Sequence, residues 1–164
     1  MKTIKVYPAN KSHFVRLLAF SKKIVAICKE LGITPVVWGG LAYFAYTKDK
    51  SWNAHDIDFL IPGKDIQKVI KILKNRKIDY EYVPEPWNSL IIKDRELIVE
   101  LDPIEHYHNK GCEFKDFKFE KIPFKAVSLE ALKKMYKHAS EVSKDKPEQH
   151  LKRLNALKGL RVEK

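Results

Sequence analysis

The sequence predicts one compact mixed α/β (α+β) domain that ends in a helical region, and three observations support this fold class. The chain has 164 residues, of which 45% are hydrophobic and 32% charged, so it is long enough to bury a core. Apolar residues follow the three- and four-residue spacing of helices in some segments and form the short runs of strands in others. These patterns alternate through the first half, whereas the end of the chain is helical only.

The first half of the chain begins with a predicted amphipathic helix. Its apolar residues lie three and four apart between Ser12, which can cap the N-terminus, and Gly32, which follows the last turn. The elements expected next are a strand at 34–38, a turn at Gly39-Gly40, a helix at 41–46, a strand at 55–61 closed by Pro62-Gly63, and a helix at 64–75.

The second half contains further strand candidates before the chain becomes helical. Alternating aromatic and charged residues at 114–120 favour one strand, and Ser128 and Pro147 mark the starts of two helices. We therefore expect a sheet-containing part over residues 1–125 and a helical region packed on it over residues 126–164. The remaining strand candidates are 78–83, 89–93 and 96–101.

The charge and cysteine content narrow the class of protein. The formal net charge is +11, a positive balance that attracts phosphate-bearing partners but also occurs on a solvated lysine-rich surface. No apolar run approaches the roughly 20 residues of a membrane span. Cys28 and Cys112 cannot form a disulfide framework, and the N-terminus lacks the apolar core of a signal peptide, so we expect a cytoplasmic protein.

Two aspartates in the second predicted strand are the first candidates for chemistry. Residues two apart on a strand project from the same face, which places the carboxylates of Asp56 and Asp58 about 6–7 Å apart. Like charges at this distance repel unless a cation lies between them, and oxygen ligands suit Mg²⁺ or Mn²⁺. The alternative is an edge strand whose exposed face carries two aspartates.

A glycine pair and a third acid accompany the aspartates. Gly39-Gly40 ends a predicted buried strand and precedes a helix, so the backbone there can approach an anion at the helix N-terminus. Glu100 interrupts an apolar strand, which is costly unless the carboxylate has a partner. Asp102 projects from the same strand face but precedes Pro103 and could begin a turn, so we favour Glu100.

In combination these motifs resemble the nucleotidyltransferase superfamily with the DNA polymerase β-like palm. Within it, the segments Trp38-Gly-Gly-Leu-Ala-Tyr-Phe-Ala and Val99-Glu-Leu-Asp-Pro-Ile resemble the small aminoglycoside and lincosamide nucleotidyltransferase-like branch. The resemblance spans roughly residues 34–155. It implies a palm with a mixed central sheet flanked by helices over residues 1–125, followed by C-terminal helices over residues 126–164.

The resemblance also implies an activity and a set of site residues. The activity is transfer of a nucleoside monophosphate from a nucleoside triphosphate such as ATP to a hydroxyl acceptor, with release of pyrophosphate. Asp56 and Asp58 would hold the Mg²⁺ or Mn²⁺, and Glu100 would complete the site and help to deprotonate the acceptor. Backbone amides at Gly39-Gly40 would face the terminal phosphates.

Several alternatives stay open at this point. Lys134 and Lys137, three apart on the last helix but one, can reach triphosphate oxygens or can simply face solvent. His106, His108 and Cys112 lie close together in sequence but lack the ligand spacing of a zinc motif. The acceptor can be a small molecule, RNA or a partner protein, and the charge slightly favours RNA. A catalytically silent nucleotide- or RNA-binding module, or a subunit of a larger toxin–antitoxin-like complex, are the rival functions.

Overall fold

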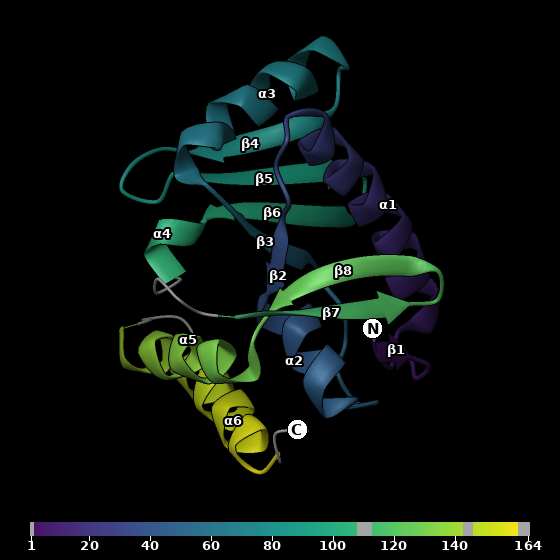
Figure 1. Ribbon diagram of the computed structural model, residues 1–164, viewed down its shortest axis with the longest axis vertical. Coiled ribbons are helices and arrows are strands. Elements are labelled where there is room, and N and C mark those ends of the chain that lie inside the picture. Colours follow the sequence, from purple (N-terminus) through teal and green to yellow (C-terminus); the bar gives the residue numbers. More distant parts are fainter. Residues whose placement is uncertain (1, 108–112, 143–145, 161–164) are drawn as a thin grey trace.

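The computed structural model describes residues 2–107, 113–142 and 146–160 of the chain (Figure 1). The strands are β1 (Lys2–Ile4), β2 (Val36–Trp38), β3 (Ile57–Ile61), β4 (Asp79–Val83), β5 (Ser89–Asp94), β6 (Leu97–Pro103), β7 (Phe114–Phe119) and β8 (Ile122–Val127). The helices are α1 (Lys11–Glu30), α2 (Gly39–Thr47), α3 (Ile66–Asn75), α4 (Ile104–Tyr107), α5 (Leu129–Val142) and α6 (Pro147–Lys158), and a 3-10 turn covers Gly63–Asp65.

All eight described strands form one mixed sheet, in the order β1-β7-β8-β2-β3-β6-β5-β4. The pairs β1/β7, β2/β8 and β3/β6 are parallel, and the other neighbours are antiparallel. The predicted α+β class with a mixed central sheet is therefore confirmed. None of the described helices is long and apolar enough to cross a membrane.

Most predicted elements form close to their predicted bounds. In α3 the buried side chains lie three and four apart, as the spacing predicted, and are Ile66, Val69, Ile70 and Leu73. Ser128 Oγ accepts a 3.1 Å hydrogen bond from the Ala131 amide and so caps α5. Pro147 lies in the first turn of α6, and Gly159 follows its last residue. Local signals were sufficient for these elements.

Three described elements were not predicted, and one helix begins earlier than expected. The short strand β1, the single turn α4 and strand β8 escaped the sequence analysis; β8 contains Pro123, which weakened its pattern. Helix α1 begins at Lys11, and Asn10 rather than Ser12 precedes it. The predicted division at residue 125 falls inside β8 and stays a prediction.

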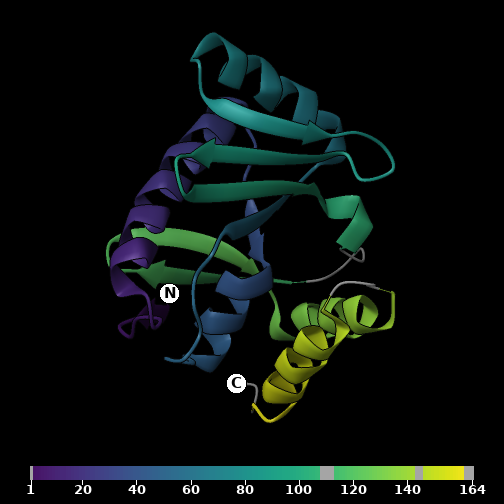
Figure 2. The ribbon, with the colours of Figure 1, turned by 180° about the vertical axis from the view of Figure 1, so that it is seen from behind.

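The two faces of the β4–β6 region are covered differently. Helix α1 packs against β6, and α3 packs against α1 and β4 on the same side. Figure 2 shows the other side, where the described helices leave the front of β4, β5 and β6 uncovered. We call this uncovered surface the acid face. Strand alternation and register assign to it residues 79, 81 and 83 of β4, 89, 91 and 93 of β5, and 98, 100 and 102 of β6.

Candidate active site

The sheet brings three of the predicted acids together. Strands β3 and β6 are parallel, and their register places Asp58 beside Glu100, while Asp56 lies two residues before Asp58. One carboxylate oxygen from each of the three residues lies within 4.8 Å of the others. All three side chains are partly buried. Two adjacent strands therefore converge three negative charges on one point.

Asp102 occupies a different environment from Glu100. The expectation that it begins a turn is wrong, because β6 continues through Pro103 and holds Asp102 in the strand. Its side chain is only 2% exposed, and its Oδ1 accepts a 2.7 Å hydrogen bond from Ser89 Oγ. Asp102 thus lies behind the three-acid group and adds negative charge to it.

The proximity of these carboxylates changes their proton affinities. Burial, and then repulsion from Asp102 and Asp56, raises the pKa of Glu100 to about 8. Burial and repulsion from Asp56 and Glu100 raise the pKa of Asp58 well above its ordinary value. Burial also raises the pKa of Asp56, and the positive charges of His55 and Arg153 oppose that rise. A bound cation would relieve this repulsion, and three carboxylate oxygens are ligands that suit Mg²⁺ or Mn²⁺.

Each glycine of the pair has a packing role that the sequence analysis missed. Helix α2 begins at Gly39 itself, which has a positive φ of 65°. A Cβ at Gly39 would lie 2.5 Å from Asp58 Oδ2, so the absent side chain makes room for that carboxylate. A Cβ at Gly40 would lie 2.8 Å from the Trp52 ring. The pair therefore fits the α2 N-terminus closely against Asp58 and the loop before β3.

The loop that carries Asp56 is held by the residue before α1. Asn10 Nδ2 donates a 2.7 Å hydrogen bond to the Ala54 carbonyl, and the Ala54 amide donates a 2.8 Å bond to Asn10 Oδ1. This reciprocal pair explains why Asn10 makes no side-chain cap on α1. It fixes the backbone two residues before Asp56 and so helps to position that acid.

A cation from the C-terminal helices faces the acids, but it is not one of those predicted. Arg153 of α6 lies 5.6 Å from the ring centre of Tyr43 and 5.9 Å from that of Tyr136, and it donates a 3.3 Å hydrogen bond to Tyr136 Oη. Its charge lowers the pKa of Asp56. Lys134 and Lys137 are exposed on α5. Sequence analysis missed Arg153 because helix periodicity does not show which helix face meets the sheet.

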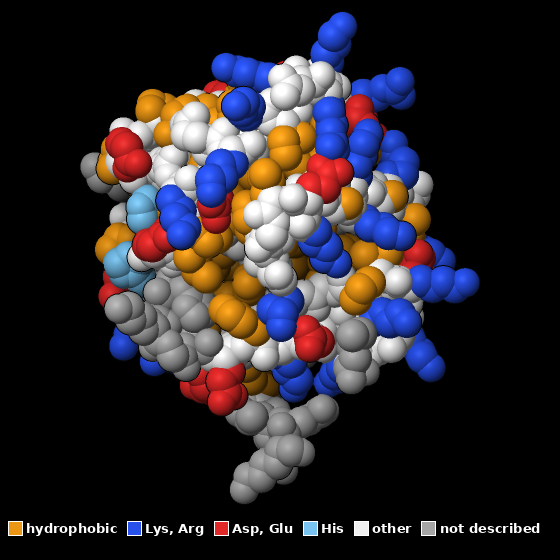
Figure 3. Space-filling model, turned by 45° about the horizontal axis from the view of Figure 1, so that its top comes forward, with side chains coloured by type: hydrophobic (Ala, Val, Ile, Leu, Met, Phe, Trp, Pro, Cys, Tyr) orange, Lys and Arg blue, Asp and Glu red, His pale blue; other side chains and the backbone are white. Residues whose placement is uncertain are grey.

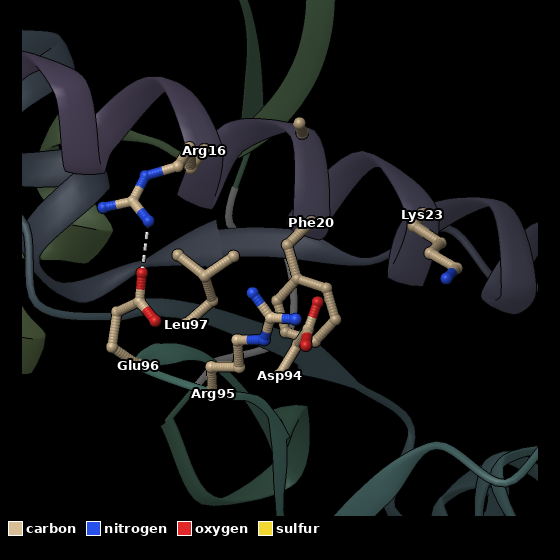
Figure 4. A pocket seen from close by; sticks show the side chains of 8 residues that line it. Arg16, Phe20, Lys23, Asp94, Arg95, Glu96 and Leu97 are labelled. Atoms are coloured by element: carbon tan, nitrogen blue, oxygen red, sulfur yellow. Dashed lines mark hydrogen bonds and ion pairs between the residues drawn. The ribbon is translucent and has the colours of Figure 1, made fainter.

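Two other features lie away from the acids or outside the described chain. Figure 4 shows a surface hollow of about 510 Å³ between α1 and the β5–β6 turn, where Arg16 pairs with Glu96 above Phe20 and Leu97. Leu97 projects from the sheet face opposite to Glu100. Of the predicted zinc ligands, His108 and Cys112 lie outside the described residues.

The comparisons with known proteins concern this fold. No protein-family model matches the chain, and no curated protein matches it. The solved antibiotic-resistance factor ANT(2'')-Ia is similar with a TM-score of 0.60 and 18% identity, over 88% of this chain and 83% of that chain. The lincosamide antibiotic adenylyltransferase LnuA, solved with lincomycin, gives a TM-score of 0.58 and 15% identity, over 92% of this chain and 99% of that one.

A third similar structure extends the comparison beyond antibiotic-modifying enzymes. It is an antigenic nucleotidyltransferase-like protein from Paracoccidioides brasiliensis, with a TM-score of 0.58 and 13% identity, over 86% of this chain and 74% of that chain. These likenesses show that the chain has the fold of the nucleotidyltransferases. The resemblance found in the sequence is thereby confirmed at the level of the fold.

Proposed function

We propose that the protein is a Mg²⁺-dependent nucleotidyltransferase that moves a nucleoside monophosphate from a nucleoside triphosphate to a hydroxyl acceptor and releases pyrophosphate. The observation that carries this proposal is the convergence of Asp56, Asp58 and Glu100 beside the N-terminus of α2. The similarity of the fold to adenylyltransferases supports the same activity. Mn²⁺ would fit the same oxygen ligands.

The three acids would share the work at the reacting phosphate. Asp56, Asp58 and Glu100 would hold the divalent cation, which when bound supplies positive charge to the phosphates of the nucleotide. Glu100 is the best candidate to take the proton of the acceptor hydroxyl, because it can hold a proton near neutral pH. Gly39 leaves the Asp58 carboxylate in place against the backbone.

The triphosphate would be bound by groups on two sides of the acids. The first amides of α2, at Gly39 and Gly40, have no side-chain cap from the residue before the helix, and a helix N-terminus favours an anion. Arg153 is held between two tyrosine rings, and its guanidinium keeps donors for a phosphate beyond its bond to Tyr136. The assignment of Lys134 and Lys137 to the triphosphate stays a prediction.

The test is pyrophosphate release by the wild-type protein and by Asp58→Asn, with each nucleoside triphosphate and Mg²⁺. We expect the variant to fold and to lose turnover, because it removes a metal ligand without changing the size of the side chain. Asp116→Asn, which changes an exposed aspartate paired with Lys125 on the distant strand β7, is the matched control. Undiminished release by Asp58→Asn would contradict the proposal. Mg²⁺-dependent nucleotide binding without release would favour the silent binding module instead.

A further inference from the structure

The acid face extends the three-acid group into an open surface. Ile91 of β5 lies directly opposite Glu100 of β6, and Ile98 lies two residues before Glu100 on the same side. Both isoleucines are partly exposed although they lie in central positions of the sheet. Val83 of β4 continues this surface toward the edge of the sheet. A partly exposed apolar strip therefore runs up to a carboxylate of the proposed site.

The charge of the acid face differs from that of the chain as a whole. Its nine residues, all of them described, include one cation, Lys93, and this lysine lies 3.5 Å from Glu81 on the neighbouring strand. Asp79 and Glu81 add negative charge at the margin. A phosphate polymer would find no row of unpaired cations here of the kind that nucleic-acid surfaces provide.

The basic side chains lie on the other side of the sheet. Residues 64–77, which form α3 and the turns around it, contain six lysines and arginines and one aspartate. Lys68, Lys71 and Lys74 are exposed on α3, and Figure 3 shows basic side chains spread over the end of the molecule that carries this helix. The sheet therefore separates much of the positive charge from the acids. Net charge is a poor guide to what reaches Glu100.

The loop at one end of the acid face presents a large aromatic side chain. Trp87, between β4 and β5, is 60% exposed. The next residue is anchored, because Asn88 Oδ1 accepts a 2.7 Å bond from Tyr82 Oη and Asn88 Nδ2 donates a 3.1 Å bond to the Gly63 carbonyl. An exposed indole on an anchored loop offers a flat apolar surface to a ring-shaped molecule.

We propose that the acid face binds the acceptor, and that this acceptor is a compact hydroxyl compound with an apolar, uncharged or cationic body rather than a nucleic acid. The proposal rests on the proposed transferase function, since Glu100 defines where the hydroxyl must lie. Ile91 and Ile98 would cover the apolar part of the compound, and Trp87 would cover its outer end.

The experiment offers three acceptor pools to the full chain with Mg²⁺ and nucleoside triphosphates labelled at the α-phosphate. The pools are cellular small molecules that pass an anion exchanger, small molecules that the exchanger retains, and total RNA. We expect label in the first pool. Ile91→Ser should lower that labelling about tenfold at limiting acceptor while Mg²⁺-dependent nucleotide binding stays unchanged. Val25→Ser, which alters a partly buried apolar residue on α1, should leave both unchanged.

The outcomes separate this proposal from the transferase assignment. Label in RNA or in the retained pool, or equal labelling by Ile91→Ser and wild type, would overturn the acceptor class or its location. Intact nucleotide binding with no label in any pool would also count against the acceptor proposal. Loss of both nucleotide binding and labelling in the wild-type protein would instead contradict the transferase function.

Discussion

Replacement of Gly39 by alanine tests how the glycine pair serves the acids. An alanine at a φ of 65° costs about 1–2 kcal/mol relative to an ordinary backbone conformation. Its Cβ would also lie 2.5 Å from Asp58 Oδ2, closer than real contacts allow, so the carboxylate must turn away. A side chain forced off its preferred rotamer costs about 0.5–1.5 kcal/mol more. We expect Gly39→Ala to destabilise the fold by about 2 kcal/mol and to displace Asp58.

A matched control separates the two costs. Gly32 has a similar φ of 75°, but a Cβ there would meet no atom within 4 Å. Gly32→Ala should therefore lose only the backbone contribution, about 1–2 kcal/mol of unfolding free energy in urea. Isothermal titration with Mg²⁺ and ATP should show at least about tenfold weaker binding for Gly39→Ala only, the equivalent of about 1.4 kcal/mol. Equal Mg²⁺-dependent binding by the two variants would refute the role given to Gly39.

Two further predictions concern the charges at the site. The metal-free pKa of Glu100, about 8 against an ordinary 4.5, is raised in the fold, so its bound proton stabilises the protein at low pH and this contribution is lost as the pH rises through about 8. Thermal melts should therefore show a metal-free Tm that falls between about pH 5 and pH 8, and a gain from Mg²⁺ that is larger at the higher pH; an equal gain at both would contradict the repulsion between the acids. Arg153→Gln should raise the KM for the nucleoside triphosphate about tenfold or more, because a charge-assisted phosphate contact is lost. The neighbouring exposed Lys152→Gln should change the KM little, and the same KM in both variants would remove Arg153 from the phosphate site.

Much of the fold was predictable because its signals are local. The apolar spacing of α3, the serine cap of α5 and the proline and glycine at the two ends of α6 each depend on a few neighbouring residues. Strand β8 was missed because Pro123 interrupts its pattern, and pairing with β7 and β2 compensates for the missing donor. The choice of Glu100 over Asp102 matched the observed grouping, since register with β3 brings Glu100 beside Asp58.

The remaining site features depend on contacts between distant segments. No local pattern shows that a Cβ at Gly40 would meet Trp52, or that Asn10 exchanges hydrogen bonds with Ala54. Arg153 lies on a helix whose sequence gives several candidate cations, and only packing against Tyr43 and Tyr136 selects it. The uncovered acid face is likewise a property of how the helices pack, and composition gave the opposite impression of its charge.

Anomalous diffraction from crystals grown with Mn²⁺ and a non-hydrolysable nucleoside triphosphate would test the central assignment most directly. The proposed site predicts a manganese peak within about 2.0–2.4 Å of carboxylate oxygens of both Asp56 and Asp58, with Glu100 completing the shell. A manganese ion that binds the nucleotide but touches neither aspartate would contradict the account.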